Sequence, residues 1–324
     1  LTLKLILYIF PIINGYRKYM NELITDLKTL ELETIKNLKN SKALNTLRAY
    51  QSDFKDFSLF CSKNGFQAMP TQPKILALYI THLSAFSKYS TLKRRLASIS
   101  ILHKTKGHYI DTKHPIIIEN LMGIKRTNGS NQKGKKPLLI NDLKILIKVI
   151  DESKEKNKRK IRDKALLLIG FSGGFRRSEL VNIVYDDVEF VSEGVKIFVK
   201  KSKTDQSGEG MTKAIPYFEN ENFCPVKALK KWIEIIDFKN GKIFNISDKN
   251  VALIIKKYAN QAGLDGYKYA GHSLRSGFAT STAESGAEER NIMAMTGHKS
   301  TEMVRRYIKE ANLFKNNALN KIKI

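Results

Sequence analysis

A length of 324 residues gives room for about two domains. The hydrophobic content of 42%, with 9% aromatic residues, is enough for packed cores and excludes a disordered chain. Lysine and arginine number 57 against 31 aspartate and glutamate residues, a formal net charge of +26, which indicates a nucleic-acid partner. A lysine bias on solvated faces with no specific partner is the alternative, but the basic clusters recur along the whole chain rather than in one tail, which favours DNA.

Residues 1–39 are expected to form an N-terminal extension that is disordered or partly helical. It opens with the apolar run LTLKLILYIFPII, which resembles the core of a signal peptide. Secretion is rejected because no small-residue cleavage pattern follows, and the run is shorter than the about 20 apolar residues that cross a bilayer. Cys61 and Cys224 fit neither a metal motif nor a disulfide framework. A cytoplasmic, nucleoid-associated protein with no membrane partner is therefore expected.

Residues 40–125 are predicted to form a small all-helical domain, because apolar residues recur there at spacings of three and four. Pro73 fits the first turn of the second helix, and the third is expected to display Lys93, Arg94 and Arg95 to DNA. The expected helices cover residues 44–60, 72–86, 90–103 and 117–124.

Residues 126–137 combine glycine, asparagine, serine and proline with several cations and no large apolar residue, which predicts an interdomain linker. We expect this basic stretch to lie along DNA phosphates; a merely soluble loop is the alternative reading. The cations concerned include Lys125, Arg126, Lys135 and Lys136.

Residues 138–324 are predicted to form a second domain that is mainly helical with a small antiparallel sheet, so that the whole chain is of the α+β class. Asn141 and Asp142 are expected to cap a helix through Ile150, and the basic run at residues 154–159 is interpreted as a solvated turn or loop. Alternating residues predict a hairpin from strands at 195–199 and 213–217, with 188–191 as a third strand. Further helices are expected over residues 163–171, 226–236, 249–261, 272–281, 288–295 and 301–314.

The last third of the chain carries residues suited to phosphodiester chemistry: His272 and Arg275, then His298, then Tyr307. Fixed cations stabilise the negative charge that spreads over the non-bridging oxygens in the transition state, and an arginine can donate two parallel hydrogen bonds to a phosphate. A tyrosine hydroxyl has an ordinary pKa of about 10 and becomes a nucleophile when cations and a proton acceptor favour its phenolate. The grouping predicts an enzyme that breaks and rejoins DNA through its own tyrosine.

Residues 174–180, GFRRSEL, match the G-x-R-x-S-E-L segment of the tyrosine recombinases, the phage-integrase family. In the same order as in that family follow Lys203 at the position of the hairpin lysine, residues 272–275 as H-x-x-R, residues 297–298 as G-H, and Tyr307 as the nucleophile. The chain therefore resembles this family over about residues 40–310.

The resemblance implies a role for each matching residue. Arg176, rather than its neighbour Arg177, binds phosphate together with Arg275 and His298. Lys203 acts as general acid on the leaving 5′ oxygen, and His272 takes part in proton transfer at Tyr307. Glu179 orients the site from behind, and Lys200 and Lys201 bind DNA. Arg305 and Arg306 are expected to place charge beside the tyrosine. Taken singly, each residue also fits a plain structural role, as a surface cation, a core histidine or a packed aromatic ring.

The resemblance also implies a two-domain clamp, in which a core-binding domain (40–125) and a catalytic domain (138–324) hold double-stranded DNA with an inverted-repeat core site. The expected assembly is a homotetramer, with a C-terminal oligomerisation segment that reaches a neighbour and with accessory DNA-bending proteins. The reaction passes through a 3′-phosphotyrosyl link and uses no metal, ATP or other cofactor. Integration of a mobile element and resolution of chromosome or plasmid dimers both remain open.

Three other functions fit parts of the sequence. A catalytically inactive, sequence-specific DNA-binding protein fits the two helices around residues 285–286, which resemble a helix-turn-helix. An enzyme like a type IB topoisomerase would share the tyrosine chemistry. A metal-dependent nuclease would use Asp186, Asp187 and Glu189, but these carboxylates read as turn and edge charges, and the six histidines have no ligand pairing for zinc.

Overall fold

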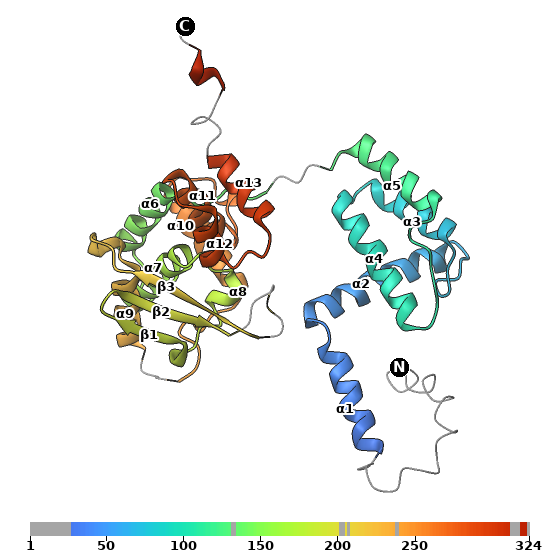
Figure 1. Ribbon diagram of the computed structural model, residues 1–324, viewed down its shortest axis with the longest axis horizontal. Coiled ribbons are helices and arrows are strands. Elements are labelled where there is room, and N and C mark those ends of the chain that lie inside the picture. The colour runs from blue at the N-terminus through green and yellow to red at the C-terminus, as the bar shows by residue number, and fades with distance from the viewer. Residues whose placement is uncertain are drawn as a thin grey trace. The chain divides into compact units, whose positions relative to one another are not determined.

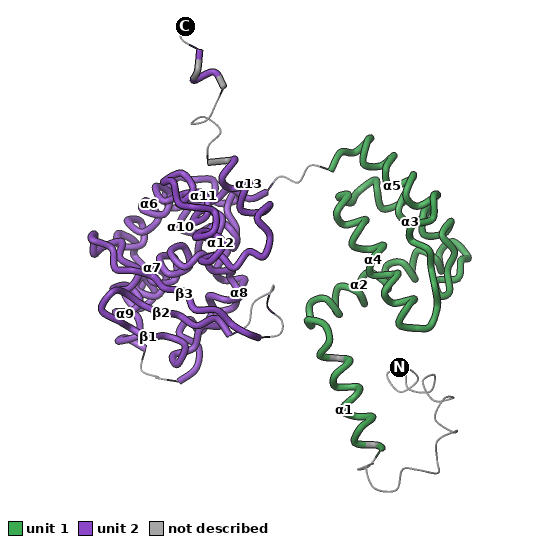
Figure 2. Tube along the Cα trace, in the orientation of Figure 1, with its two compact units in different colours: residues 1–132 green, residues 133–324 purple. Residues whose placement is uncertain are grey.

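A computed structural model of the chain describes residues 27–130, 134–200, 205, 208–236, 240–311 and 318–322. The chain divides into two compact units, residues 1–132 and 133–324 (Figures 1 and 2). This division falls inside the stretch that was interpreted as a linker. Lys201 and Lys203 lie outside the described residues, as does half of the expected C-terminal oligomerisation segment, residues 315–324.

The described part of the first unit is helical, as its apolar spacing predicted. Proline stands in the first turn of α3 and of α5, where its missing N–H is not needed. The core forms where α2 packs on α4 and α3 on α5, around residues such as Phe57, Tyr79 and Leu92. The helices are α1 (Leu27–Asn40), α2 (Leu44–Lys63), α3 (Pro73–Ser84), α4 (Tyr89–Thr105) and α5 (Pro115–Asn128).

In this unit, one helix lies in the N-terminal extension, which was expected to be disordered or partly helical, and another runs past its expected end. Residues 27–40 of the N-terminal extension form the regular helix α1, which carries exposed leucines at positions 27, 30, 32 and 38. Helix α5 continues through Asn128, past Ile124 where its apolar stripe ends. Helix α5 extends into polar sequence, where apolar periodicity gives no signal.

The second unit is mainly helical with one small sheet (Figure 1). Its α-helices are α6 (Ile140–Glu152), α7 (Asn157–Ser172), α8 (Arg177–Leu180), α9 (Pro225–Ile235), α10 (Asp248–Gln261), α11 (Ser273–Glu284), α12 (Glu289–Thr296) and α13 (Thr301–Ala311). Its 3₁₀ helices are η3 (Tyr185–Asp187), η4 (Glu221–Phe223), η5 (Gly266–Lys268) and η6 (Ala318–Lys321). The strands are β1 (Val188–Val191), β2 (Gly194–Val199) and β3 (Met211–Pro216).

The sheet has the order β1-β2-β3 and is antiparallel throughout, which confirms the predicted hairpin and third strand. Val195, Ile197 and Val199 of β2 point into the core, as their alternation requires. Helix α7 runs through the middle of the unit and packs on α6, α9 and α11. Its second half, ALLLIGFS, is buried all round, which explains why it reads as a continuous apolar run.

Two local predictions in this unit were wrong. Helix α6 begins at Ile140 with Leu139 at the N-cap, so Asn141 and Asp142 lie in its first turn and do not cap it. Asp142 instead accepts hydrogen bonds from Lys136 and from the Tyr269 hydroxyl, the latter at 2.9 Å. The basic run is a turn or loop only over residues 154–156, because residues 157–159 start α7. Tertiary partners explain the first of these differences.

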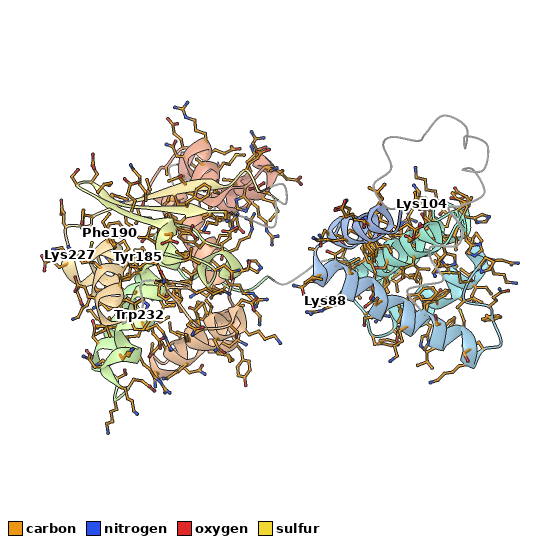
Figure 3. All side chains as sticks on the ribbon, turned by 90° about the horizontal axis from the view of Figure 1, so that it is seen from below. Lys88, Lys104, Tyr185, Phe190, Lys227 and Trp232 are labelled. Atoms are coloured by element: carbon orange, nitrogen blue, oxygen red, sulfur yellow. The ribbon has the colours of Figure 1, made fainter. Side chains whose placement is uncertain are left out.

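The charge surplus lies on the surfaces of both units. Lys88, Lys104 and Lys227 are exposed examples in Figure 3, whereas Trp232 of α9 is buried and donates from Nε1 to the carbonyl of Ile243 at 3.0 Å. Within the described ranges, no helix combines the length and apolar character that crossing a bilayer requires.

Candidate active site

The site is built around the turn that ends α7. Gly174 has φ of 53°, in the left-handed region that favours glycine. A Cβ atom there would lie 3.0 Å from Phe278 of α11 and 3.1 Å from Thr296 of α12, so the turn is packed closely against both helices. It delivers Arg176 at the N-cap position of α8.

Glu179 holds Arg176 by two hydrogen bonds. Its Oε1 accepts from Arg176 Nη1 at 2.5 Å, and its Oε2 accepts from the Arg176 backbone N–H at 3.0 Å. The two side chains are only 2% and 11% exposed, respectively, so the pair is shielded from water. The carboxylate thereby fixes the plane of the guanidinium. The neighbouring Arg177 instead forms an ion pair with Asp248, with Nε 3.1 Å from Oδ2.

Arg275, on α11, reaches the same turn from the other side. Its Nη1 donates to the carbonyl oxygen of Gly174 at 3.0 Å, and its side chain is buried. Burial lowers the pKa of Arg275 to about 10; the nearby Arg176 adds to this, while Glu179 and Tyr307 oppose it. The guanidinium therefore stays charged near neutral pH. Its buried Nη2 has no hydrogen-bond partner within the described structure, which leaves a donor for an anion.

His298 follows the end of α12. Gly297 adopts the left-handed conformation, with φ of 64°, and turns the chain after α12. Beyond this turn, His298 Nδ1 and Thr296 Oγ1 form a hydrogen bond of 2.8 Å. Burial lowers the pKa of His298 to about 4, and the charges of Arg275, Arg176 and Lys213 add to the effect. The imidazole is therefore neutral at neutral pH. Because the charges of Arg275 and Arg176 act on it, His298 lies close to both arginines.

Tyr307 lies on α13 and is half-buried. Its ring packs against a small apolar cluster formed by Ala279, Ala283, Ile292 and Val304. The ring centroid is 6.2 Å from that of His298. Arg305, two residues earlier, forms an ion pair with Glu289 at 3.1 Å. Arg275 is close enough to Tyr307 for the two groups to interact electrostatically.

His272 occupies the N-cap position of α11, three residues before Arg275, and is exposed. Its carbonyl oxygen accepts from the backbone N–H of Ser276 at 3.0 Å. Six residues were expected to be catalytic. The structure brings four of them together: Arg176, Arg275, His298 and Tyr307. His272 stands at the N-cap of the helix that carries Arg275, and Lys203 lies outside the described residues.

Lys213 belongs to this site but was missed by sequence reasoning. It is fully buried on β3, and its Nζ donates to the carbonyl oxygens of Gly173, at 2.8 Å, and of Met295. Burial lowers its pKa to about 7; Glu179 opposes this, whereas Arg275 and Arg176 contribute to it. The signal was present in the sequence, because strand alternation puts Lys213 on the same face as the buried Ile215.

The residues expected to bind DNA from the first unit fall into two groups. Lys93, Lys125 and Arg126 are exposed. Arg94 instead forms an ion pair with the buried Asp53, and Arg95, whose side chain is 20% exposed, forms one with Asp56. The last two arginines connect α4 to α2, so part of the basic patch serves packing.

Expected DNA-binding lysines of the second unit also have partners within it. Lys135 Nζ donates to the carbonyl oxygen of Tyr267 at 2.6 Å, and Lys136 Nζ lies 3.1 Å from Asp142. Lys200 Nζ lies 2.8 Å from Asp187. These contacts position the lysines at the surface of their own unit.

The acidic group near β1 has structural partners. Asp187 Oδ2 accepts from the Val184 backbone N–H at 3.2 Å, its Oδ1 faces Lys200, and Glu189 pairs with Lys196 at 3.6 Å. In the parts of the chain that the structure describes, no three histidine, cysteine or acidic side chains gather in a way that could hold a metal ion.

The fold and this site define an enzyme of the tyrosine site-specific DNA recombinase class. The family model described as "Phage integrase family" matches residues 138–313. A protein named "Integrase/recombinase xerD homolog", from Selenomonas ruminantium, is 41% identical over 97% of this chain and 96% of its own length. The chain therefore belongs to the phage integrase family. A "Tyrosine recombinase XerC" of Staphylococcus aureus is 25% identical over 87% of this chain and 91% of its own length.

Solved structures agree on the fold. The XerH site-specific recombinase bound to palindromic difH substrate, in a post-cleavage complex, matches with a TM-score of 0.65 and 19% identity over 89% of this chain and 85% of that one. A lambda integrase dimer bound to a COC′ core site matches with a TM-score of 0.58 and 19% identity over 93% of this chain and 100% of that one.

Proposed function

We propose that this recombinase cleaves and rejoins double-stranded DNA through a 3′-phosphotyrosyl intermediate on Tyr307, with neither metal nor ATP. The observation that carries the proposal is the convergence on one turn of two guanidinium groups that lie 99 positions apart in the chain, Arg176 and Arg275, with Tyr307 close to Arg275. Two fixed cations and an adjacent hydroxyl are what an in-line attack on a phosphodiester requires.

The proposed step balances as follows. Arg176 and Arg275 donate to the non-bridging oxygens of the scissile phosphate, and the unpartnered Nη2 of Arg275 is available for this purpose. The Tyr307 oxygen forms a bond to phosphorus as its proton passes to His272. The bond from phosphorus to the 5′ oxygen breaks, and Lys203 protonates that oxygen.

The reverse step restores the DNA. A 5′ hydroxyl from a partner strand attacks the phosphotyrosyl link, and Tyr307 leaves. One phosphodiester is exchanged for another of similar energy, so no nucleotide has to be hydrolysed. His298, neutral at working pH, serves as a hydrogen-bonding group towards the phosphate in both directions.

Recognition and assembly are proposed from charge and from the structural neighbours. The exposed Lys93, Lys125 and Arg126 contact phosphates and contribute affinity that depends on salt. One neighbour is described as XerH bound to a palindromic substrate, and another as a lambda integrase tetramer bound to a Holliday junction, with a TM-score of 0.57. We infer an inverted-repeat core site, a homotetramer joined by C-terminal segments, and assistance from DNA-bending proteins.

The biological setting we propose is DNA in the cytoplasm, at the nucleoid. The reaction either integrates a mobile element or resolves chromosome or plasmid dimers. Sequencing the recombination junctions formed in a cell would distinguish the two, since integration joins foreign DNA to a target and resolution joins identical sites.

The test uses a nicked duplex that loses a short strand after cleavage and so traps the covalent intermediate. Its core site is selected by binding from random-sequence duplexes, and the reaction contains EDTA. We expect a DNA adduct that Tyr307→Phe abolishes, whereas Tyr267→Phe, a change at an exposed tyrosine of the same unit, leaves it intact.

Four outcomes would reject the proposal. An adduct that persists in Tyr307→Phe would identify another nucleophile, and an adduct that requires added metal would indicate different chemistry. Binding to the selected site with no adduct would support an inactive DNA-binding protein. Relaxation of supercoiled plasmids that lack the site would instead indicate a type IB topoisomerase.

A further inference from the structure

Lys213 is an unusual residue to find at the centre of a folded unit. Its side chain is fully buried on β3, opposite Ile197 of β2, and its Nζ lies over the Phe175 ring, 4.8 Å from the centroid. Burial of a lysine costs free energy unless the ammonium finds partners. A fully buried lysine that is held in place is therefore a candidate for a specific role.

The two partners of Lys213 are carbonyl oxygens at the ends of two different helices. Gly173 is the C-cap residue of α7, and Met295 lies in the last turn of α12. Carbonyl oxygens at helix C-termini carry partial negative charge and lack partners within their own helix, so a cation is favoured at both. One ammonium group therefore joins two helix ends.

The joined segments are those that carry the site. Gly173 begins the turn that delivers Arg176 and whose Gly174 carbonyl oxygen accepts from Arg275. Met295 lies three residues before His298 in the sequence. The Lys213 contact thus joins the segment that carries the site's first arginine to the segment that carries its histidine.

We propose that Lys213 is a positioning residue for DNA cleavage, whose ammonium group ties the Arg176 turn to the end of α12 and thereby holds Arg176 and His298 at one phosphate. The proposal deepens the proposed function and rests on it. Lys213 does not act as the general acid, because its side chain is fully buried and its ammonium is bonded to two backbone carbonyls.

The tie also depends on pH. The charged groups that act on Lys213 are Glu179, which favours the ammonium, and Arg275 and Arg176, which disfavour it together with burial; His298 is neutral at working pH. With a pKa of about 7, the protonated form is lost as pH rises through that value. A DNA phosphate between the two arginines adds negative charge nearby, so bound DNA should favour protonation of Lys213.

The first test needs no catalysis. Amide hydrogen exchange is measured in the whole protein for peptides covering residues 171–176 and 293–298. Lys213→Met keeps a similar side-chain length without a donor, and we expect exchange to rise about tenfold or more in both segments. Tyr258→Phe is the matched control, because it deletes one buried hydrogen bond, to Asp163 at 2.9 Å, elsewhere in the same unit.

The outcomes separate cleanly. A coupled rise in both segments in Lys213→Met, absent in Tyr258→Phe, supports the tie; an unchanged rate in either segment overturns it. If Lys213→Met does not fold, the wild-type protein decides. After correction for intrinsic exchange, protection of both segments is expected to fall together between pH 6 and 9, and constant protection overturns the proposal.

The second test measures adduct formation on the trapping duplex. Lys213→Met is expected to slow adduct formation by about tenfold or more, while DNA affinity stays within a few-fold of wild type. The fall in rate that accompanies deprotonation of Lys213 at alkaline pH should also disappear in this variant. An unchanged rate and pH profile overturn the positioning role. Failure of wild type to form any adduct would refute the proposed function, and the exchange measurement would still decide the tie.

Discussion

Replacing Glu179 by glutamine tests how much the site depends on a carboxylate that does not face the DNA. The substitution preserves shape but removes the charge that holds Arg176 through Oε1 and Oε2. Both side chains are almost completely shielded from water, so screening does little to weaken the pair. A hydrogen bond to a charged group is worth about 1.5–3 kcal/mol.

At about 1.4 kcal/mol for each factor of ten, that loss corresponds to adduct formation roughly 10- to 150-fold slower. DNA affinity should change little, because the exposed cations that contact phosphates are untouched. The pH dependence should also move. Burial already lowers the pKa of Lys213 and Glu179 opposes it, so the Gln variant lowers that pKa further and shifts the alkaline decline of the rate to lower pH.

The assay is single-turnover trapping on the nicked duplex from pH 6 to 9. Glu189→Gln is the matched control, since Glu189 is exposed in the same unit and pairs with Lys196 at 3.6 Å; it should behave as wild type. A Glu179→Gln rate within twofold of wild type, with an unshifted profile, would refute the claim that this carboxylate orients the arginine.

Arg275→Lys keeps the charge but loses the planar fork, so adduct formation should slow by about a hundredfold or more with near-normal DNA affinity in a gel-shift assay; a near-normal rate would show that a point charge suffices. The pKa of His298 is lowered in the folded protein to about 4, from an ordinary value of 6.5. Between these two pH values the histidine is protonated in the unfolded chain but neutral in the folded protein. Stability should therefore decline across that window, and His298→Asn should flatten the decline in Tm, whereas parallel Tm curves would contradict it. Lys125→Ala should reduce the slope of log affinity against log salt by about 0.9 if this exposed lysine contacts a phosphate, and an unchanged slope would assign it to a solvated face.

Much of the fold could be predicted because local signals were strong. The apolar stripe of α2 and the alternation in β2 identify their elements within a few residues. Helix α1 was expected only as part of a disordered or partly helical extension, although Leu27, Leu30 and Leu38 recur at helical spacing. The cap of α6 was assigned to Asn141 and Asp142, yet Asp142 bonds Lys136 and Tyr269, which are distant or outside the helix. No local pattern contains that information.

The site shows the same division. The ordered motifs named Arg176, Arg275, His298 and Tyr307, and the structure brings these four together. A basic composition does not distinguish a cation that faces DNA from one that has a carboxylate partner, so Arg94 and Arg95 were grouped with Lys93 although both pair with aspartates of α2. Such pairs join residues about forty positions apart, which only the folded chain reveals.

Lys213 was overlooked for a different reason. Strand alternation places Lys213 on the inward face of β3. Lysine is so common in this chain, however, that its presence there did not indicate a site residue. Only burial, with two helix ends as partners, distinguishes it from the exposed lysines. In a strongly basic protein, an inward-facing cation within a strand is therefore the more informative signal.

The most direct measurement identifies the amino acid and the DNA end that become linked. The trapped adduct is digested with a protease that cuts after lysine, and the peptide bearing DNA is sequenced by mass spectrometry. Residues 300–309, STEMVRRYIK, contain a single tyrosine, Tyr307. Our account predicts that this peptide carries the 3′ phosphate of the cleaved strand; a link to another residue, or to a 5′ phosphate, would contradict it.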